Sequence, residues 1–205
     1  MGPPKSGGGQ GERGAGAPRA RKQRGVVPPE ATESARRRAV LAVGSNLGDR
    51  AGTLTGCMKA IGRISDTDVL AVSPVYETAP VGGPPQRDYL NAVLVVETGL
   101  RPRDLLAAAR GIEADFGRVR DVRFGPRTLD IDIISYAGQV SDEPELTLPH
   151  PRAHERAFVL APWHDVDPAA ELPGRGSVQR LLAGLDRSGI RRRPDVVLPS
   201  PGCRS

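Results

Sequence analysis

The stretch FGRVRDVRFGPRTLDIDIISY, which runs from Phe116 to Tyr136, decides how the rest of the chain is interpreted. Ten of its residues, which include a Gly-Pro turn, contain the four arginines Arg118, Arg120, Arg123 and Arg127. A strand is predicted next, from Leu129 to Tyr136, in which Asp130 and Asp132 alternate with apolar residues. Because side chains on a strand alternate between its two faces, both carboxylates are expected on one face and the apolar side chains on the other.

This pattern predicts a site for Mg²⁺ and a polyphosphate. Two carboxylates on one face, roughly 6.5–7 Å apart at the backbone, can converge on Mg²⁺, which usually takes its remaining ligands from substrate phosphates. Guanidinium groups bind phosphate oxygens in bidentate fashion. An amphipathic strand beside a solvated arginine loop is the alternative. Arginine is common here, since only three of the 29 basic residues are lysine, so spacing alone leaves both interpretations open.

Length, charge and cysteine content narrow the class of protein. A chain of 205 residues is expected to form one domain with a real core. Residues 1–38 contain nine basic and three acidic side chains, whereas the remainder contains 20 basic and 21 acidic ones. The net charge of +5 therefore lies in the N-terminal segment, and the folded part is not expected to bind nucleic acid. Two cysteines, Cys57 and Cys203, do not make a disulfide framework.

The same composition predicts three segments. Residues 1–38 are expected to be a disordered tail rich in Arg, Gly and Pro, residues 39–186 the folded domain, and residues 187–205 a flexible C-terminal tail. A transit peptide is the alternative for the first segment, although its Gly and Pro content opposes an amphipathic helix. Neither a signal peptide nor an apolar run of membrane-spanning length occurs, so we expect a cytoplasmic protein that does not bind membranes.

The order of predicted elements favours an α+β fold. Strands are expected at 39–43, 68–76, 89–98 and 129–136, with one helix ending near residue 64 and another over 101–116. This is the β-α-β-β-α-β order of the ferredoxin-like fold, an antiparallel sheet covered by helices, here with additional C-terminal elements that include helical segments near 153–160 and 177–185. No dinucleotide fingerprint and no phosphate loop is present, so arginines and metal would have to hold any phosphates.

Several motifs, taken in order, resemble those of the 6-hydroxymethyl-7,8-dihydropterin pyrophosphokinase family. They are GSNLGDR at 44–50, ETAPVG at 77–82, DYLNAV at 88–93, FGRVR at 116–120, RFGPRTLDIDI at 123–133 and, at 148–158, LPHPR followed by Arg156 and Phe158. The resemblance covers about residues 39–186. It implies a ferredoxin-like fold and an enzyme of folate biosynthesis. Such an enzyme uses two Mg²⁺ ions to transfer a diphosphate from ATP to the hydroxymethyl group of the pterin, and it releases AMP.

The resemblance also implies the roles of individual residues. Asp130 and Asp132 would hold both metal ions, while Arg118 and Arg127 would neutralise the triphosphate during transfer. Further ATP contacts are implied at Glu113, Arg120, Arg123, His150 and Arg156. Contacts to the pterin are implied at Thr78, Ala79, Val81, Tyr89, Asn91 and Phe158, with the rings of Tyr89 and Phe158 enclosing the pterin.

The chain departs from the family pattern in several places, which include Ala79 in place of a frequent proline and a loop between Arg120 and Arg123 that is one residue shorter than in some members. One other class of protein also competes. Phe124 replaces a frequent tryptophan, and Arg110 replaces a common glutamine near the adenine, so the adenine contacts stay undetermined. The competing class is a ferredoxin-like RNA-binding module with a basic tail. Such a module needs exposed aromatic side chains on its central strands, and the strands predicted here offer little beyond Tyr89. We expect a monomer that binds ATP and a reduced hydroxymethylpterin.

Overall fold

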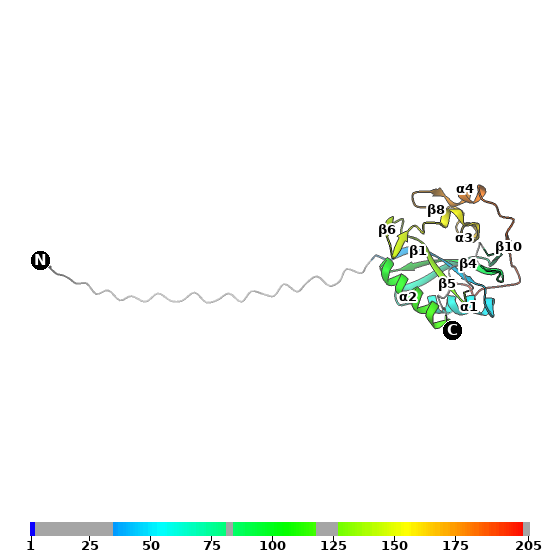
Figure 1. The fold of residues 1–205 in the computed structure, drawn as a ribbon, viewed down its shortest axis with the longest axis horizontal. Coiled ribbons are helices and arrows are strands. Elements are labelled where there is room, and N and C mark those ends of the chain that lie inside the picture. Colours follow the sequence, from blue (N-terminus) through cyan, green and yellow to red (C-terminus); the bar gives the residue numbers. More distant parts are fainter. Residues whose placement is uncertain (3–34, 81–83, 118–126, 203–205) are drawn as a thin grey trace. The chain divides into compact units, whose positions relative to one another are not determined.

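The computed structural model of the chain describes residues 1–2, 35–80, 84–117 and 127–202 (Figure 1). Within these ranges the chain forms a mixed α+β fold, in which a six-stranded antiparallel sheet is accompanied by four α-helices. The long strands are β1 (Arg37–Ser45), β4 (Tyr89–Thr98) and β5 (Asp130–Tyr136). The expectation of an antiparallel sheet with helices is confirmed.

The sheet has the strand order β10-β3-β4-β1-β5, and β2 also pairs with β4. Its short strands are β2 (Thr67–Val72), β3 (Tyr76–Thr78) and β10 (Ile190–Arg192). β2 and β3 pair with successive parts of β4, where one continuous strand over 68–76 was expected. The break falls at Ser73 and Pro74, because proline has no N–H to donate to a ladder, and the Ser73 hydroxyl accepts a hydrogen bond from Val93 N at 2.8 Å.

Helices α1 (Arg50–Ile61) and α2 (Pro102–Asp115) cover one face of the sheet (Figure 1). The apolar side chains of both helices are buried there, against the residues of β1, β4 and β5 that point to this face. The Asp49 side chain accepts a hydrogen bond from Gly52 N and so caps α1. Pro102 lies in the first turn of α2, where no N–H is needed.

Helices α3 (Ala157–Val166) and α4 (Val178–Ala183) lie on the other side (Figure 1). They pack on Val40, Val93 and Ile134 of that face, and Ala42 packs against the same cluster. A 3-10 turn, η1 (Ala153–Glu155), precedes α3, where a single helix near 153–160 was expected. On the same face, the small residues Ala42 and Gly44 of β1 line a cavity.

Two small ribbons complete the fold. They are β6 (Ser141–Glu143) with β7 (Leu146–Leu148), and β8 (Glu171–Leu172) with β9 (Gly176–Ser177). No helix among the described residues is long and apolar enough to cross a membrane.

The segment after residue 186 differs from the flexible tail that the sequence predicted for 187–205. Strand β10 pairs with β3, and Val196 and Leu198 pack against the core. The segment is ordered because Arg191 and Arg193 bind the buried carboxylate of Glu77. At the other end, β1 already begins at Arg37, two residues before the predicted domain start, and residues 3–34 of the predicted tail lie outside the described ranges.

Candidate active site

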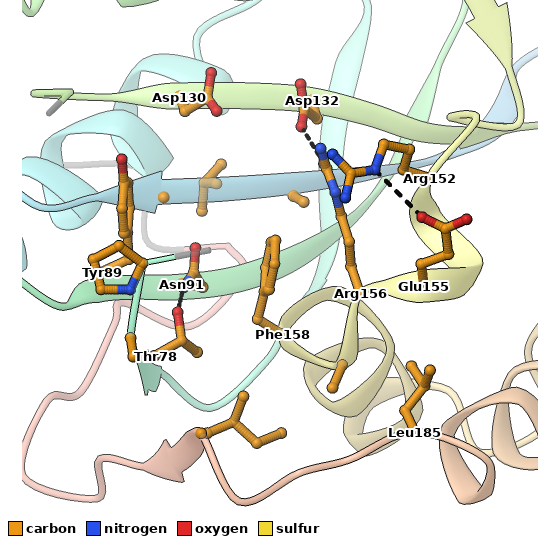
Figure 2. Close-up of a pocket in the computed structure, with 18 of the residues that line it drawn as sticks. Thr78, Tyr89, Asn91, Asp130, Asp132, Arg152, Glu155, Arg156, Phe158 and Leu185 are labelled. Carbon is orange, nitrogen blue, oxygen red and sulfur yellow. Dashed lines mark hydrogen bonds and ion pairs between the residues drawn. The ribbon is translucent and has the colours of Figure 1, made fainter. Parts of the chain in front are cut away.

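A cavity of about 720 Å³ occupies the part of the sheet face that α3 leaves uncovered (Figure 2). The register of the strands explains its chemistry. Gly44 of β1 lies opposite Asn91 of β4 and Asp130 of β5, and Ala42 lies opposite Asp132. Small residues in the middle strand therefore leave space between an amide on one side and two carboxylates on the other.

Asp130 and Asp132 both line this cavity, whereas Ile131 and Ile133 between and beyond them are buried on the opposite face. The predicted alternation is thus confirmed. Each carboxylate forms an ion pair with an arginine, Asp130 with Arg127 and Asp132 with Arg156, the latter over 3.0 Å. The aspartates remain partly exposed to the cavity, so their oxygens are accessible to a cation.

A second cavity, of about 260 Å³, lies along the edge of β5 and is lined by Arg110, Glu113, His150 and Asp132 among others. Asp132 therefore borders both cavities. His150 Nε2 lies 3.7 Å from Asp132 Oδ2, and His150 Nδ1 accepts a hydrogen bond from Arg152 N at 3.2 Å. Burial lowers the pKa of His150 below its ordinary value, although Asp132 opposes this shift.

Glu113 is almost completely buried, with 3% of its surface exposed. Its Oε1 accepts a hydrogen bond of 2.7 Å from Ile131 N, the amide between the two aspartates. In the sequence, Glu113 lies on the same side of a helix as Leu106 and Arg110, and this position does not predict the contact. The contact depends on how α2 packs against β5. Glu113 thus supports the strand that holds the carboxylates.

The opposite side of the large cavity is aromatic and amidic. Figure 2 shows the rings of Tyr89 and Phe158 on either side of Asn91. The Asn91 side chain is buried and donates a hydrogen bond of 2.8 Å to the Thr78 hydroxyl. The Arg156 guanidinium carbon lies 5.6 Å from the centre of the Phe158 ring. A flat ligand between the two rings would therefore reach both an amide and the arginine beside Asp132.

Sequence reasoning did not identify several residues that shape this site. A Cβ at Gly44 would lie 2.7 Å from Asn91 Oδ1, so glycine is required for the amide to stay in place. Asn46 is fully buried, and its side chain accepts from Arg127 N at 2.7 Å and donates to Gln86 Oε1 at 2.8 Å. Both residues belong to the GSNLGDR motif. The position of this motif directly after a predicted strand was the feature of the sequence that could have identified them.

The structure brings most of the candidate residues together. Eleven of the described candidates line one cavity or both, namely Thr78, Ala79, Tyr89, Asn91, Glu113, Arg127, Asp130, Asp132, His150, Arg156 and Phe158. The remaining candidates, Val81, Arg118, Arg120 and Arg123, lie outside the described residues. No group of three or more His, Cys, Asp and Glu side chains suited to a metal ion occurs in the part of the chain that the structure describes.

The chain is similar to known proteins of one family. The family model for 7,8-dihydro-6-hydroxymethylpterin-pyrophosphokinase (HPPK) matches residues 40–168. The 2-amino-4-hydroxy-6-hydroxymethyldihydropteridine pyrophosphokinase of Pseudomonas aeruginosa is 41% identical over 157 residues, which is 77% of this chain and 97% of the relative. The enzyme of the same name from Mycobacterium tuberculosis is 45% identical over 180 residues, 80% of this chain and 94% of the relative.

Solved structures show a similar fold. The crystal structure of Plasmodium falciparum HPPK-DHPS A437G with pteroate matches with a TM-score of 0.58 and 14% identity, over 75% of this chain and 44% of that chain. The same protein with STZ-DHP gives a TM-score of 0.59, with 13% identity, over 74% of this chain and 46% of that one. The present chain thus spans less than half of those longer chains.

Proposed function

Since this chain belongs to the 7,8-dihydro-6-hydroxymethylpterin-pyrophosphokinase family, we propose that its large cavity binds the reduced pterin and its second cavity part of the ATP. The reaction is the transfer of a diphosphate from ATP to the hydroxymethyl group of 6-hydroxymethyl-7,8-dihydropterin, with release of AMP, in folate biosynthesis. One observation supports this placement above the others: Asp132 borders both cavities. Two substrates bound on either side of one carboxylate would meet beside it.

The pterin would lie between the rings of Tyr89 and Phe158. Aromatic rings bury large apolar areas and stack on flat ligands, and the Asn91 amide between them offers a donor and an acceptor to the edge of a heterocycle. The backbone of Thr78, Ala79 and Val81 would supply further contacts. Tyr89 thus lines a cavity, whereas an RNA-binding module needs aromatic side chains on an open sheet, so this competing function has no support.

Asp130 and Asp132 suit Mg²⁺ by their chemistry, since carboxylate oxygens are its preferred protein ligands. Two carboxylates leave most of an octahedral shell to phosphates and water, which agrees with the lack of a larger acidic cluster among the described residues. We propose that these two residues hold two ions. When bound, Mg²⁺ would neutralise charge on the phosphates and on the departing AMP.

The arginines of the site would then bind phosphate oxygens. Arg127 and Arg156 are paired with the two aspartates, so both guanidinium groups already lie where the phosphates would enter. Diphosphate transfer requires positioning and charge neutralisation from the protein. Arg127 and Arg156 supply both functions, and Arg118, Arg120 and Arg123 are proposed to add to them. His150, whose pKa is lowered by burial, and Glu113 border the cavity proposed for the nucleotide.

We propose in addition that the core is ferredoxin-like. If β2 and β3 count as one interrupted strand, the elements β1, α1, β2/β3, β4, α2 and β5 follow the order β-α-β-β-α-β. The sheet order, with β1 between β4 and β5 and β2/β3 outside β4, supports this assignment. The C-terminal helices and β10 are additions to it. That the protein is a monomer in the cytoplasm stays a prediction.

Product analysis tests the proposed function. The full-length protein is incubated with ATP, Mg²⁺ and 6-hydroxymethyl-7,8-dihydropterin, and the pterin product is examined by mass spectrometry. We expect a pterin that has gained two phosphoryl groups, together with AMP. A pterin with one phosphoryl group, together with ADP, would show that the protein is a simple kinase.

A further inference from the structure

A cluster of charges lies behind the pterin side of the cavity and outside the proposed catalytic groups. Its centre is the carboxylate of Glu77 in β3, which is 8% exposed. Three arginines bind it: Arg50 donates to Oε1 at 2.9 Å, Arg193 donates to Oε2 at 2.8 Å, and Arg191 forms an ion pair with Oε2 as well. Glu77 does not line the cavity, whereas its neighbour Thr78 does, because successive side chains on a strand point to opposite faces.

Two of these arginines fix the C-terminal segment. In the pairing of β10 with β3, Arg191 lies opposite Glu77 and Ile190 lies opposite Thr78. Arg193 N also donates to Val75 O at 2.8 Å. The charges therefore reinforce a pairing of only three residues, which is short for a strand at the edge of a sheet.

The segment held in this way forms part of the cavity wall. Leu185, Asp186, Ser188, Gly189 and Ile190 all line the large cavity. Gly189 O accepts a hydrogen bond from Ala79 N at 3.4 Å, so this wall is joined to the backbone that is proposed to contact the pterin. In Figure 2, Leu185 lies on the far side of the cavity from Asp130 and Asp132. All five residues lie beyond the range 40–168 that the family model matches.

The third arginine reaches the other side of the same cavity. Arg50 NH1 donates a hydrogen bond of 2.6 Å to the carbonyl oxygen of Asp88, which is the residue directly before Tyr89. One buried carboxylate thereby connects the C-terminal wall, the Thr78 strand and the backbone next to Tyr89. None of its three arginines lines the second cavity or contacts Asp130 or Asp132 in the interactions that the structure shows.

We propose that Glu77 is a positioning residue for the pterin, which acts by holding Gly189 and Ile190 in place as a wall of the pterin cavity. The inference rests on the proposed function. The C-terminal segment would then contribute to pterin recognition through Ile190, although this segment lies outside the family motifs. ATP recognition, on the other side of β5, is independent of this cluster.

Steady-state kinetics of AMP release by the full-length protein, with each substrate varied in turn, tests the proposal. Glu77→Gln keeps the shape of the side chain and removes its charge. We expect it to raise the KM for the pterin about tenfold and to change the KM for ATP less than about twofold. Arg191→Ala should act in the same direction, and Arg191→Lys should restore part of the loss because it keeps the charge.

Two further variants complete the experiment: Ile190→Ala is a second test, and Asp104→Asn is the control. Arg191 is largely exposed, with 73% of its side chain accessible, so its replacement is not expected to prevent folding. Ile190→Ala leaves the charges intact and should raise only the KM for the pterin. The control is Asp104→Asn, which removes an exposed ion pair with Arg101 on α2 and should change neither KM.

The outcomes separate the two proposals. If the wild-type protein forms no AMP, the proposed function is wrong and this inference falls with it. If the wild-type protein is active but Glu77→Gln and Ile190→Ala change both KM values equally, or neither of them, only the inference about the C-terminal wall is overturned.

Discussion

Arg156 donates a hydrogen bond of 3.0 Å to Asp132, and the same guanidinium group lies 5.6 Å from the ring centre of Phe158. Its NH1 is also 3.4 Å from His150 Nε2. One side chain at the start of α3 thus contacts a carboxylate of the proposed metal site, an aromatic ring of the pterin cavity and a histidine of the second cavity. This relationship places Arg156 where the two substrates would meet.

Replacement of Arg156 should therefore affect both substrates. We expect Arg156→Ala to lower kcat/KM for ATP and for the pterin by about 100-fold, because a charge-assisted contact to phosphate is lost. Arg156→Lys should recover only part of this loss, since an ammonium group cannot keep the planar contacts of a guanidinium. Steady-state AMP release measures both effects. Activity of Arg156→Ala within about threefold of the wild type would contradict the assignment.

Gly44→Ala should weaken pterin binding without unfolding the protein. The new Cβ would lie 2.7 Å from Asn91 Oδ1 and would displace the amide from its hydrogen bond with Thr78. We expect the KM for the pterin to rise about tenfold while the KM for ATP stays unchanged. Gly111→Ala is the matched control, because a Cβ there meets nothing within 4 Å, and alanine favours a helix. Equal KM values for the two variants would refute the role of Gly44.

The ring and the hydroxyl group of Tyr89 should contribute differently to pterin binding. Tyr89→Phe keeps the ring and removes only the hydroxyl that lies 3.3 Å from Gln86 Oε1, so the KM for the pterin should change less than about threefold. Tyr89→Ala removes the stacking surface and should raise this KM by about tenfold or more. Fluorescence titration of the pterin provides a direct check. A larger effect from Tyr89→Phe than from Tyr89→Ala would show that the hydroxyl, not the ring, binds the ligand.

Acid should remove the stabilisation that Glu77 provides. The hydrogen bond from Arg191, followed by those from Arg50 and Arg193, lowers the pKa of Glu77 from 4.5 to about 2. A carboxyl group whose pKa is lower in the folded state stabilises the fold fully above its unfolded pKa, and the stabilisation disappears as the pH falls towards the folded value. The difference in urea midpoint between the wild type and Glu77→Gln should be constant above about pH 5.5 and shrink between pH 4.5 and 2. A difference that does not depend on pH would contradict this account.

The parts of the site that the sequence predicted are those that depend on local pattern. Strand β4 has the predicted bounds, Tyr89–Thr98, and the alternation of Asp130 and Asp132 with isoleucines fixed which face their carboxylates occupy. The resemblance to the family implied that Phe158, far along the chain, belongs to the same site. The predictions for β4 and for the two aspartates needed only the periodicity that is visible in the sequence.

The parts that the sequence missed depend on contacts between distant segments. The burial of Glu113 follows from the packing of α2 on β5, and the need for glycine at position 44 follows from the register between β1 and β4. The C-terminal segment, rich in Arg and Pro, has the composition of a loose tail. It becomes ordered because Glu77, more than 100 residues earlier, provides the opposing charge. No local pattern reports such a pairing.

We propose that Asp130 and Asp132 hold the metal ions needed for diphosphate transfer, and the roles of the other residues depend on this. The most direct test is the rate of AMP release, at saturating ATP and pterin with Mg²⁺ present, for Asp130→Asn and Asp132→Asn beside the wild type. We predict that Asp132→Asn abolishes turnover and that Asp130→Asn reduces it by at least about 100-fold, because each variant removes a charged ligand while it preserves the shape of the side chain. Rates for both variants within about threefold of the wild type would contradict the claim.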